Sequence, residues 1–198
     1  MASELFFAFI VFAVATLFTP GPNNIMLMTS GLNFGFARTL PHALGVSIGF
    51  GFMVATVGIG LGAVFAAYPL LYQILKYAGA AYLLYLAWRI ATAVGVHGEG
   101  RGRPFTFLQA AAFQWVNAKA WVMAVGAVTA YAGLAAYPAN VAFIGGMFAV
   151  LGTVSSLTWL TFGTALKRLV SDPRAVRIFN LVMATLLAAS LIPVFLEG

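Results

Sequence analysis

The stretch Thr19-Pro20-Gly21-Pro22-Asn23-Asn24 interrupts the first apolar segment of the chain. Residues 5–18 before it are almost wholly apolar, and residues 25–28 after it continue the apolar pattern. Proline removes a backbone donor, and the lipid core holds no water that can satisfy the polar groups such a break exposes. Irregular backbone is tolerated at membrane depth where it is buried in protein or lines a wet cavity. The break therefore predicts a substrate site, and with it a transporter.

The composition predicts an integral membrane protein. The chain has 198 residues, of which 63% are hydrophobic and 7% charged, and its mean hydropathy is +1.00. Soluble domains carry about 25% charged residues. The net charge of +6 suggests nucleic acid as a partner, but the basic residues are spread among apolar runs, which argues against it. The chain has no cysteine, and His42 and His97 are far apart in sequence, so we expect neither a metal site nor a cofactor.

Six apolar segments have the length of about 20 residues that a membrane helix needs. Their expected bounds are 5–28, 39–66, 70–91, 105–130, 138–166 and 175–196. Basic residues fall in alternate connections: Arg38; Arg89, Arg101 and Arg103; and Lys167, Arg168, Arg174 and Arg177. The positive-inside rule places these connections in the cytoplasm and both termini outside.

The expected fold class is an all-α, polytopic membrane bundle of six helices whose first helix is broken. We expect one transporter domain, 1–198, in which a Gly-rich charged linker at 95–104 separates halves of about 1–94 and 105–198. Three helices per half would place the halves in opposite orientations, as in inverted repeats. The spacing of Gly45 and Gly49 suits close helix packing within one bundle, and a homodimer seam stays open as the alternative.

The break offers two interpretations. Proline suits the first turn of a helix, so Pro22 predicts a new half-helix with Asn23 and Asn24 at its start. The positive end of that helix would face a cavity and suit the carboxylate of an amino acid. Alternatively, the break is a structural kink whose asparagines bond the freed carbonyl groups.

Lys119 is the second candidate, since it lies near the middle of the fourth segment beside Asn117. A charge at that depth costs several kcal/mol unless it meets a partner or water. In a functional role, Lys119 would contact a substrate carboxylate or lose its proton on burial. The structural alternative is that its side chain extends to the cytoplasmic surface. His42 is the other candidate for proton coupling, and the alternative for it is a bond to a nearby carbonyl. The chain's acids, Glu4, Glu99, Asp172 and Glu197, are terminal or in connections, which argues against a divalent-cation site.

The stretch 18–24, followed by Ser30-Gly31 and Gly35, resembles the N-terminal motif of the LysE/RhtB family of amino-acid exporters. The stretches Gly-Ala-Ala-Tyr-Leu at 79–83 and Gln-Trp-Val-Asn-Ala-Lys-Ala-Trp at 114–121 are similar to the family in order and spacing. The resemblance implies a six-helix exporter of amino acids or their derivatives in the bacterial inner membrane, driven by the proton gradient. By that match, the motif positions are Pro20, Pro22, Asn23, Asn24, Asn117 and Lys119. Together with Gly21 of the break, they are the predicted substrate-binding residues.

One departure concerns Ala118, where the family often has proline. Alanine favours a continuous helix, so a second break in the fourth segment would have to rely on tertiary contacts.

The leading interpretation is export of a small zwitterionic or cationic metabolite by alternating access. Its expected partners are an amino-acid-like substrate, the proton and membrane lipid, and nucleic acid is not expected. A metal or inorganic-ion transporter and a non-transporting membrane scaffold are the alternatives. An enzyme is not expected, because Ser47, Ser155 and Ser156 have no histidine near them in sequence to serve as a base.

Overall fold

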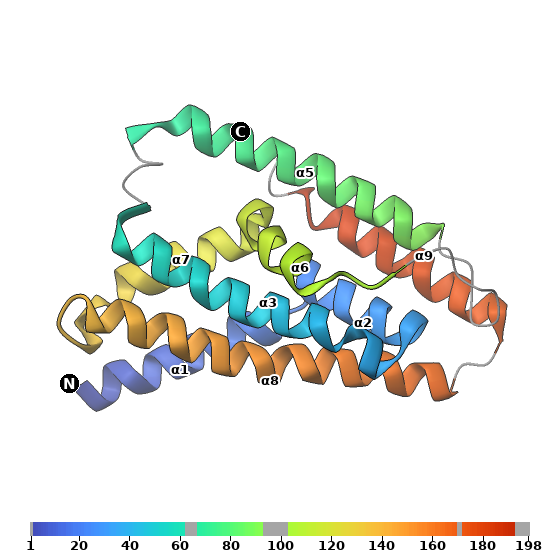
Figure 1. The fold of residues 1–198 in the computed structure, drawn as a ribbon, viewed down its shortest axis with the longest axis horizontal. Coiled ribbons are helices and arrows are strands. Elements are labelled where there is room, and N and C mark those ends of the chain that lie inside the picture. Colours follow the sequence, from blue (N-terminus) through green and yellow to red (C-terminus); the bar gives the residue numbers. More distant parts are fainter. Residues whose placement is uncertain (1, 62–66, 93–102, 170–171, 193–198) are drawn as a thin grey trace.

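The structure is a computed structural model that describes residues 2–61, 67–92, 103–169 and 172–192. Most of the predicted linker, together with His97, Glu99, Arg101 and Glu197, lies outside the described residues. All regular structure in the described ranges is helical (Figure 1). The elements are α1 (Ala2–Phe18), α2 (Pro22–Phe34), α3 (Phe36–Thr56), the π turn η1 (Val57–Leu61), α5 (Pro69–Ala91), α6 (Phe107–Phe113), the 3-10 turn η2 (Gln114–Val116), α7 (Ala118–Ala130), the 3-10 turn η3 (Ala132–Leu134), α8 (Ala139–Leu169) and α9 (Pro173–Ala189).

The predicted break in the first helix is confirmed. Helices α1 and α2 meet at an angle of 51°. Gly21 is extended, with φ −166° and ψ −179°, and Pro22 occupies the first turn of α2, as the sequence predicts. Helix α2 continues to Phe34, past the expected end at residue 28, and stops at Gly35, whose φ of 82° favours glycine.

A second break divides the fourth segment, although alanine at position 118 favours a continuous helix. The turn η2 follows α6 and ends at Val116. Asn117 is extended, with ψ 106°, and α7 begins at Ala118. The Asn117 side-chain oxygen accepts a hydrogen bond of 3.2 Å from the backbone N–H of Lys119, which caps α7. On the other side, α5 approaches so closely that a side chain at Gly79 would collide with the Val116 carbonyl. Tertiary contact and capping therefore override the helix propensity of alanine.

Glycines allow the helices to approach closely within the bundle. A Cβ atom at Gly49 would lie 2.7 Å from the Ala111 Cβ of α6, and one at Gly51 would lie 2.7 Å from the Gly145 carbonyl oxygen of α8. One buried cluster gathers around Phe9, Phe50 and Phe148, and another around Phe113 and Leu187. The predicted use of glycine for packing within one bundle is thus confirmed.

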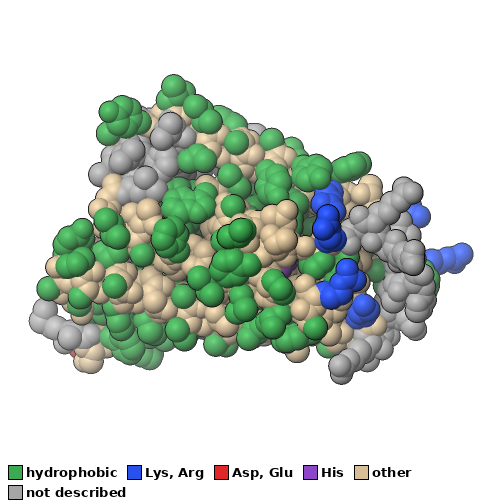
Figure 2. Space-filling view, viewed as in Figure 1, with side chains coloured by type: hydrophobic (Ala, Val, Ile, Leu, Met, Phe, Trp, Pro, Cys, Tyr) green, Lys and Arg blue, Asp and Glu red, His purple; other side chains and the backbone are tan. Residues whose placement is uncertain are grey.

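The surface is that of a membrane protein. Exposed apolar side chains occur along all the long helices, including Phe7, Phe52, Trp88 and Val150. Two helices of the described chain are long and apolar enough to span a membrane, at Phe36–Gly60 and Ala139–Lys167, and the bent pair α1–α2 would make a third. Figure 2 shows Lys and Arg side chains gathered at one end of the molecule, the end where α3 and α9 begin and α5 and α8 finish.

Candidate functional site

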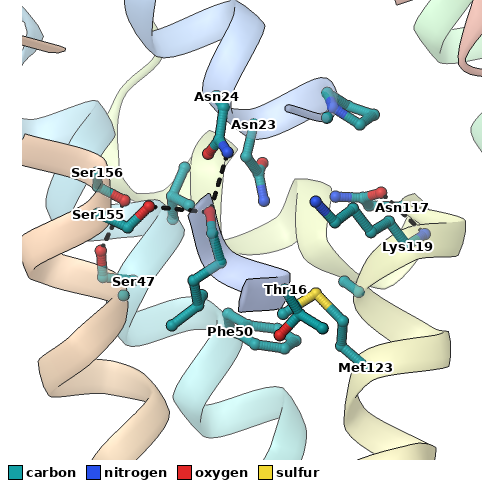
Figure 3. A pocket seen from close by; sticks show the side chains of 16 residues that line it. Thr16, Asn23, Asn24, Ser47, Phe50, Asn117, Lys119, Met123, Ser155 and Ser156 are labelled. Carbon is teal, nitrogen blue, oxygen red and sulfur yellow. Dashed lines mark hydrogen bonds between the residues drawn. The ribbon is translucent and has the colours of Figure 1, made fainter. Parts of the chain in front are cut away.

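A small polar cavity lies where the two breaks meet. Its volume is about 40 Å³, and it is lined by residues from α1, α2, α3, α7 and α8. One water needs roughly 10–15 Å³, so the cavity has room for more than one water-sized group. Figure 3 shows the side chains of Asn23 and Lys119 reaching toward the same space, with the serines on the opposite side. The polar lining residues are Thr16, Asn23, Asn24, Ser47, Asn117, Lys119, Ser155 and Ser156.

The carbonyl groups freed at the end of α1 collect donors from three helices. The Asn24 side-chain amide donates to the Leu17 and Thr19 carbonyls, at 3.0 Å each. The Ser155 hydroxyl also donates to the Leu17 carbonyl, at 2.9 Å, and the Lys119 ammonium donates to the Thr19 carbonyl, at 2.6 Å. The second interpretation of the break, in which asparagine bonds the freed carbonyls, therefore holds for Asn24.

Asn23 and Gln114 form an amide clasp that joins the two breaks. The Asn23 amide donates to Gln114 Oε1 at 2.8 Å, and the Gln114 amide donates back to Asn23 Oδ1 at 3.2 Å. Gln114 is completely buried and also donates to the Ala110 carbonyl at 2.8 Å. Gln114 is not among the residues that the sequence predicts for the site. The available signal was a polar side chain in an apolar segment, three positions before the asparagine at the second break.

Lys119 lies against the first break. It is half-buried, and its stem passes so close to Gly21 that a Cβ atom there would lie 2.9 Å from Lys119 Cδ and 3.1 Å from Nζ. Because glycine at position 21 has no side chain, the lysine side chain can occupy this space. Lys119 is the one charged side chain among the described residues that line this cavity.

A second cavity lies on the other side of the breaks, toward α5 and α9. Its volume is about 200 Å³, and it shares Gly21, Pro22, Asn117 and Lys119 with the smaller cavity. Its other lining residues are Pro20, Leu83, Ala118, Ser190 and Leu191. The predicted site residues of both breaks, Pro20 to Asn24 together with Asn117 and Lys119, therefore meet around two adjoining cavities.

His42 lies apart from both cavities. It is 2% exposed, its ring centroid is 5.2 Å from that of Phe105, and neither ring nitrogen has a hydrogen-bond partner in the described structure. The expected carbonyl bond of His42 is therefore absent from the described part of the chain. The described residues also contain no cluster of His, Asp or Glu that would hold a metal ion.

The hydroxyls of three serines form a cluster on the α3–α8 side of the smaller cavity. The Ser47 hydroxyl donates to the Ser156 hydroxyl at 3.0 Å and bonds the Ala43 carbonyl, also at 3.0 Å, while Ser155 reaches α1. In sequence, these serines stand out only as candidate enzyme nucleophiles. Their hydrogen bonds instead link α1, α3 and α8 beside the cavity.

Comparison with known proteins finds a family match. The sequence model of the LysE type translocator family matches residues 14–194. The chain belongs to the LysE type translocator family. Cysteine/O-acetylserine efflux proteins of Escherichia coli strains HS and K12 and of Shigella sonnei strain Ss046 are each 30% identical to this LysE-type chain over 199 residues, which cover 98% of the chain and all of each relative. No solved structure matches it.

Proposed function

We propose that this LysE-type chain is a secondary transporter that exports a small amino acid, or an amino-acid derivative, with an uncharged side chain. The observation that carries the proposal is the position of Lys119, the one charged side chain among the described residues of both cavities, between the two helix breaks. The relatives named for efflux of cysteine and O-acetylserine, which have uncharged side chains, support the same class.

The polar groups around the smaller cavity suit the head of an amino acid. The carboxylate would accept hydrogen bonds from the Lys119 ammonium in place of the Thr19 carbonyl, aided by the positive start of α2. Amide and hydroxyl oxygens on the cavity wall would receive the substrate ammonium. A cationic side chain would add a second positive charge near Lys119, and none of the described residues that line the cavities is a carboxylate, which favours neutral substrates over cationic ones.

The same chemistry decides between the alternatives. A divalent cation would need hard oxygen ligands, and among the residues described around the cavities none is a carboxylate. A scaffold would need neither a cavity at membrane depth nor a lysine beside it. Transport of an organic zwitterion accounts for both, and it requires no cofactor and no enzymatic step.

We further propose six spans in two inverted three-helix repeats, 1–94 and 105–198, in one domain. The directions of the helices in Figure 1 support this plan: α1–α2, α5 and α8 run away from the N-terminal end, and α3, α6–α7 and α9 run back. The second break, in α6–α7, is the counterpart that an inverted repeat requires for the break in α1–α2. The basic end would face the cytoplasm of a bacterium, with both termini outside its inner membrane.

Alternating access coupled to the proton gradient completes the proposal. The breaks supply the points about which half-helices can tilt, and the cavities lie between them. Lys119 is the preferred proton carrier because it lies in the site, and His42, which lies outside both cavities, is the second candidate.

Counterflow in proteoliposomes tests the function. Vesicles loaded with unlabelled serine, cysteine, O-acetylserine or lysine should accumulate the matching labelled compound in the first three cases and not with lysine. Lys119→Gln should abolish the exchange. Lys76→Gln is the control and should keep it, because Lys76 is also half-buried but lies on α5. Absence of exchange with every amino acid, or wild-type exchange in Lys119→Gln, would refute the proposal.

A further inference from the structure

The two cavities differ in size and chemistry although they share a wall. The smaller one, of about 40 Å³, is lined by amide and hydroxyl groups together with apolar side chains such as Phe50 and Met123. The larger one, of about 200 Å³, is bounded by Pro20, Leu83, Ala118 and Leu191, with Ser190 as a polar group away from the breaks. Lys119 and Asn117 stand between them.

The smaller cavity is the tighter of the two, and its amide and hydroxyl groups suit the charged head of an amino acid. A carboxylate at Lys119 and an ammonium group among the neighbouring oxygens would fill it. The side chain of a substrate held in this way can extend across the wall that the cavities share. The larger cavity begins at that wall, at Gly21 and Pro22.

We infer that the larger cavity is the subsite for the substrate side chain and that Leu83, Ser190 and Leu191 determine which side chain fits. This inference rests on the proposed function. Leu83 and Leu191 are each 3% exposed and belong to the buried cluster between α5 and α9, so the walls of the subsite are fixed by packing. The ligand class is an uncharged side chain with apolar atoms.

Ser190 adds one polar preference. Its hydroxyl donates to the Leu187 carbonyl at 2.7 Å, so its oxygen remains available as an acceptor toward the cavity. A thiol, hydroxyl or amide at the end of the substrate side chain would meet this acceptor, whereas a carboxylate would meet no donor from it. The subsite therefore suits short neutral side chains, and one that carries a weak donor gains a hydrogen bond to Ser190 there.

A pair of substitutions on α5 tests the subsite by exchange. Leu83→Phe fills the cavity and should lower exchange of O-acetylserine relative to alanine by roughly tenfold, the scale on which apolar pockets reject a poorly fitting group. Leu86→Phe is the matched control, because Leu86 is 4% exposed, lies in the same cluster and does not line the cavity. It should change exchange of both substrates by the same factor.

A single cysteine gives a second readout that does not depend on tolerance of phenylalanine. Because the chain has no cysteine, Ser190→Cys is labelled by a maleimide without background. O-acetylserine should slow the labelling at least about tenfold and glycine should not, since only the former has a side chain that enters the subsite. Ser156→Cys, in the smaller cavity, should be protected by both compounds.

The outcomes separate the two proposals. If wild-type protein exchanges no amino acid, the proposed function fails and this subsite fails with it. If wild-type protein exchanges amino acids but Leu83→Phe and Leu86→Phe have the same selectivity, or glycine and O-acetylserine protect Ser190→Cys equally, the subsite alone is overturned.

Discussion

The clasp between Asn23 and Gln114 predicts a measurable energetic coupling between the two helix breaks. We consider Asn23→Ala, Gln114→Ala and the double variant, compared by the free energy of unfolding. The clasp contains two hydrogen bonds, of 2.8 and 3.2 Å. Interhelical hydrogen bonds in membrane proteins are worth about 0.6 kcal/mol each, so the coupling energy should be about 1 kcal/mol.

The single substitutions should cost more than this coupling. Asn23→Ala leaves Gln114 Oε1 without the donor it has in the native structure, and Gln114 is completely buried. An unsatisfied buried acceptor costs about 1–3 kcal/mol. The double variant removes both groups and should be less destabilised than the sum of the singles.

Reversible unfolding in mixed detergent micelles, followed by tryptophan fluorescence, measures these energies. Asn33 and Asn180 supply the control cycle, because they exchange two amide hydrogen bonds, of 3.1 and 3.4 Å, between α2 and α9 outside both cavities. Their coupling should be smaller, since the bonds are longer, and disrupting them should leave substrate selectivity unchanged. A coupling energy near zero for Asn23 and Gln114 would refute the view that the clasp holds the breaks together.

Further predictions concern glycines and His42. Gly21→Ala should displace the Lys119 stem and reduce counterflow several-fold, because its Cβ would lie 2.9 Å from Lys119 Cδ, whereas Gly146→Ala meets nothing within 4 Å and should keep wild-type counterflow; equal rates would contradict the contact. Gly49→Ala should lower the unfolding free energy by about 1–3 kcal/mol through overpacking against α6. An unchanged value would show that α6 shifts to accommodate the added methyl group. His42→Leu should unfold with an equal or higher free energy, because it removes two unpaired buried nitrogens. Its exchange should still respond to a pH gradient, and loss of that response would instead assign proton coupling to His42.

The first break was predictable because local chemistry imposes it. Pro20 and Pro22 cannot complete a helical hydrogen-bond ladder, whatever the rest of the fold does. The predicted start of the half-helix at Pro22 is correct for the same reason.

The second break was not predictable from local propensity. Ala118 has no intrinsic tendency to end a helix, and the turn depends on the Asn117 cap and on the approach of Gly79 to Val116. Gly79 lies in another helix and far away in sequence. The same limit explains why Gln114 was left out of the site, since its role depends on Asn23 of the other break.

The partner of Lys119 bears on how an exporter can bind and release substrate at one site. If Lys119 were paired with a buried carboxylate, substrate binding would strand that anion at a cost of about 3–5 kcal/mol. Its observed partner is the Thr19 carbonyl, which also accepts a hydrogen bond from the Asn24 amide. When Lys119 turns to a substrate carboxylate, Thr19 therefore keeps a donor and no buried acceptor is stranded. Asn24 would thus lower the cost of this exchange of partners through its amide donor, and the motif joins a structural role to a functional one.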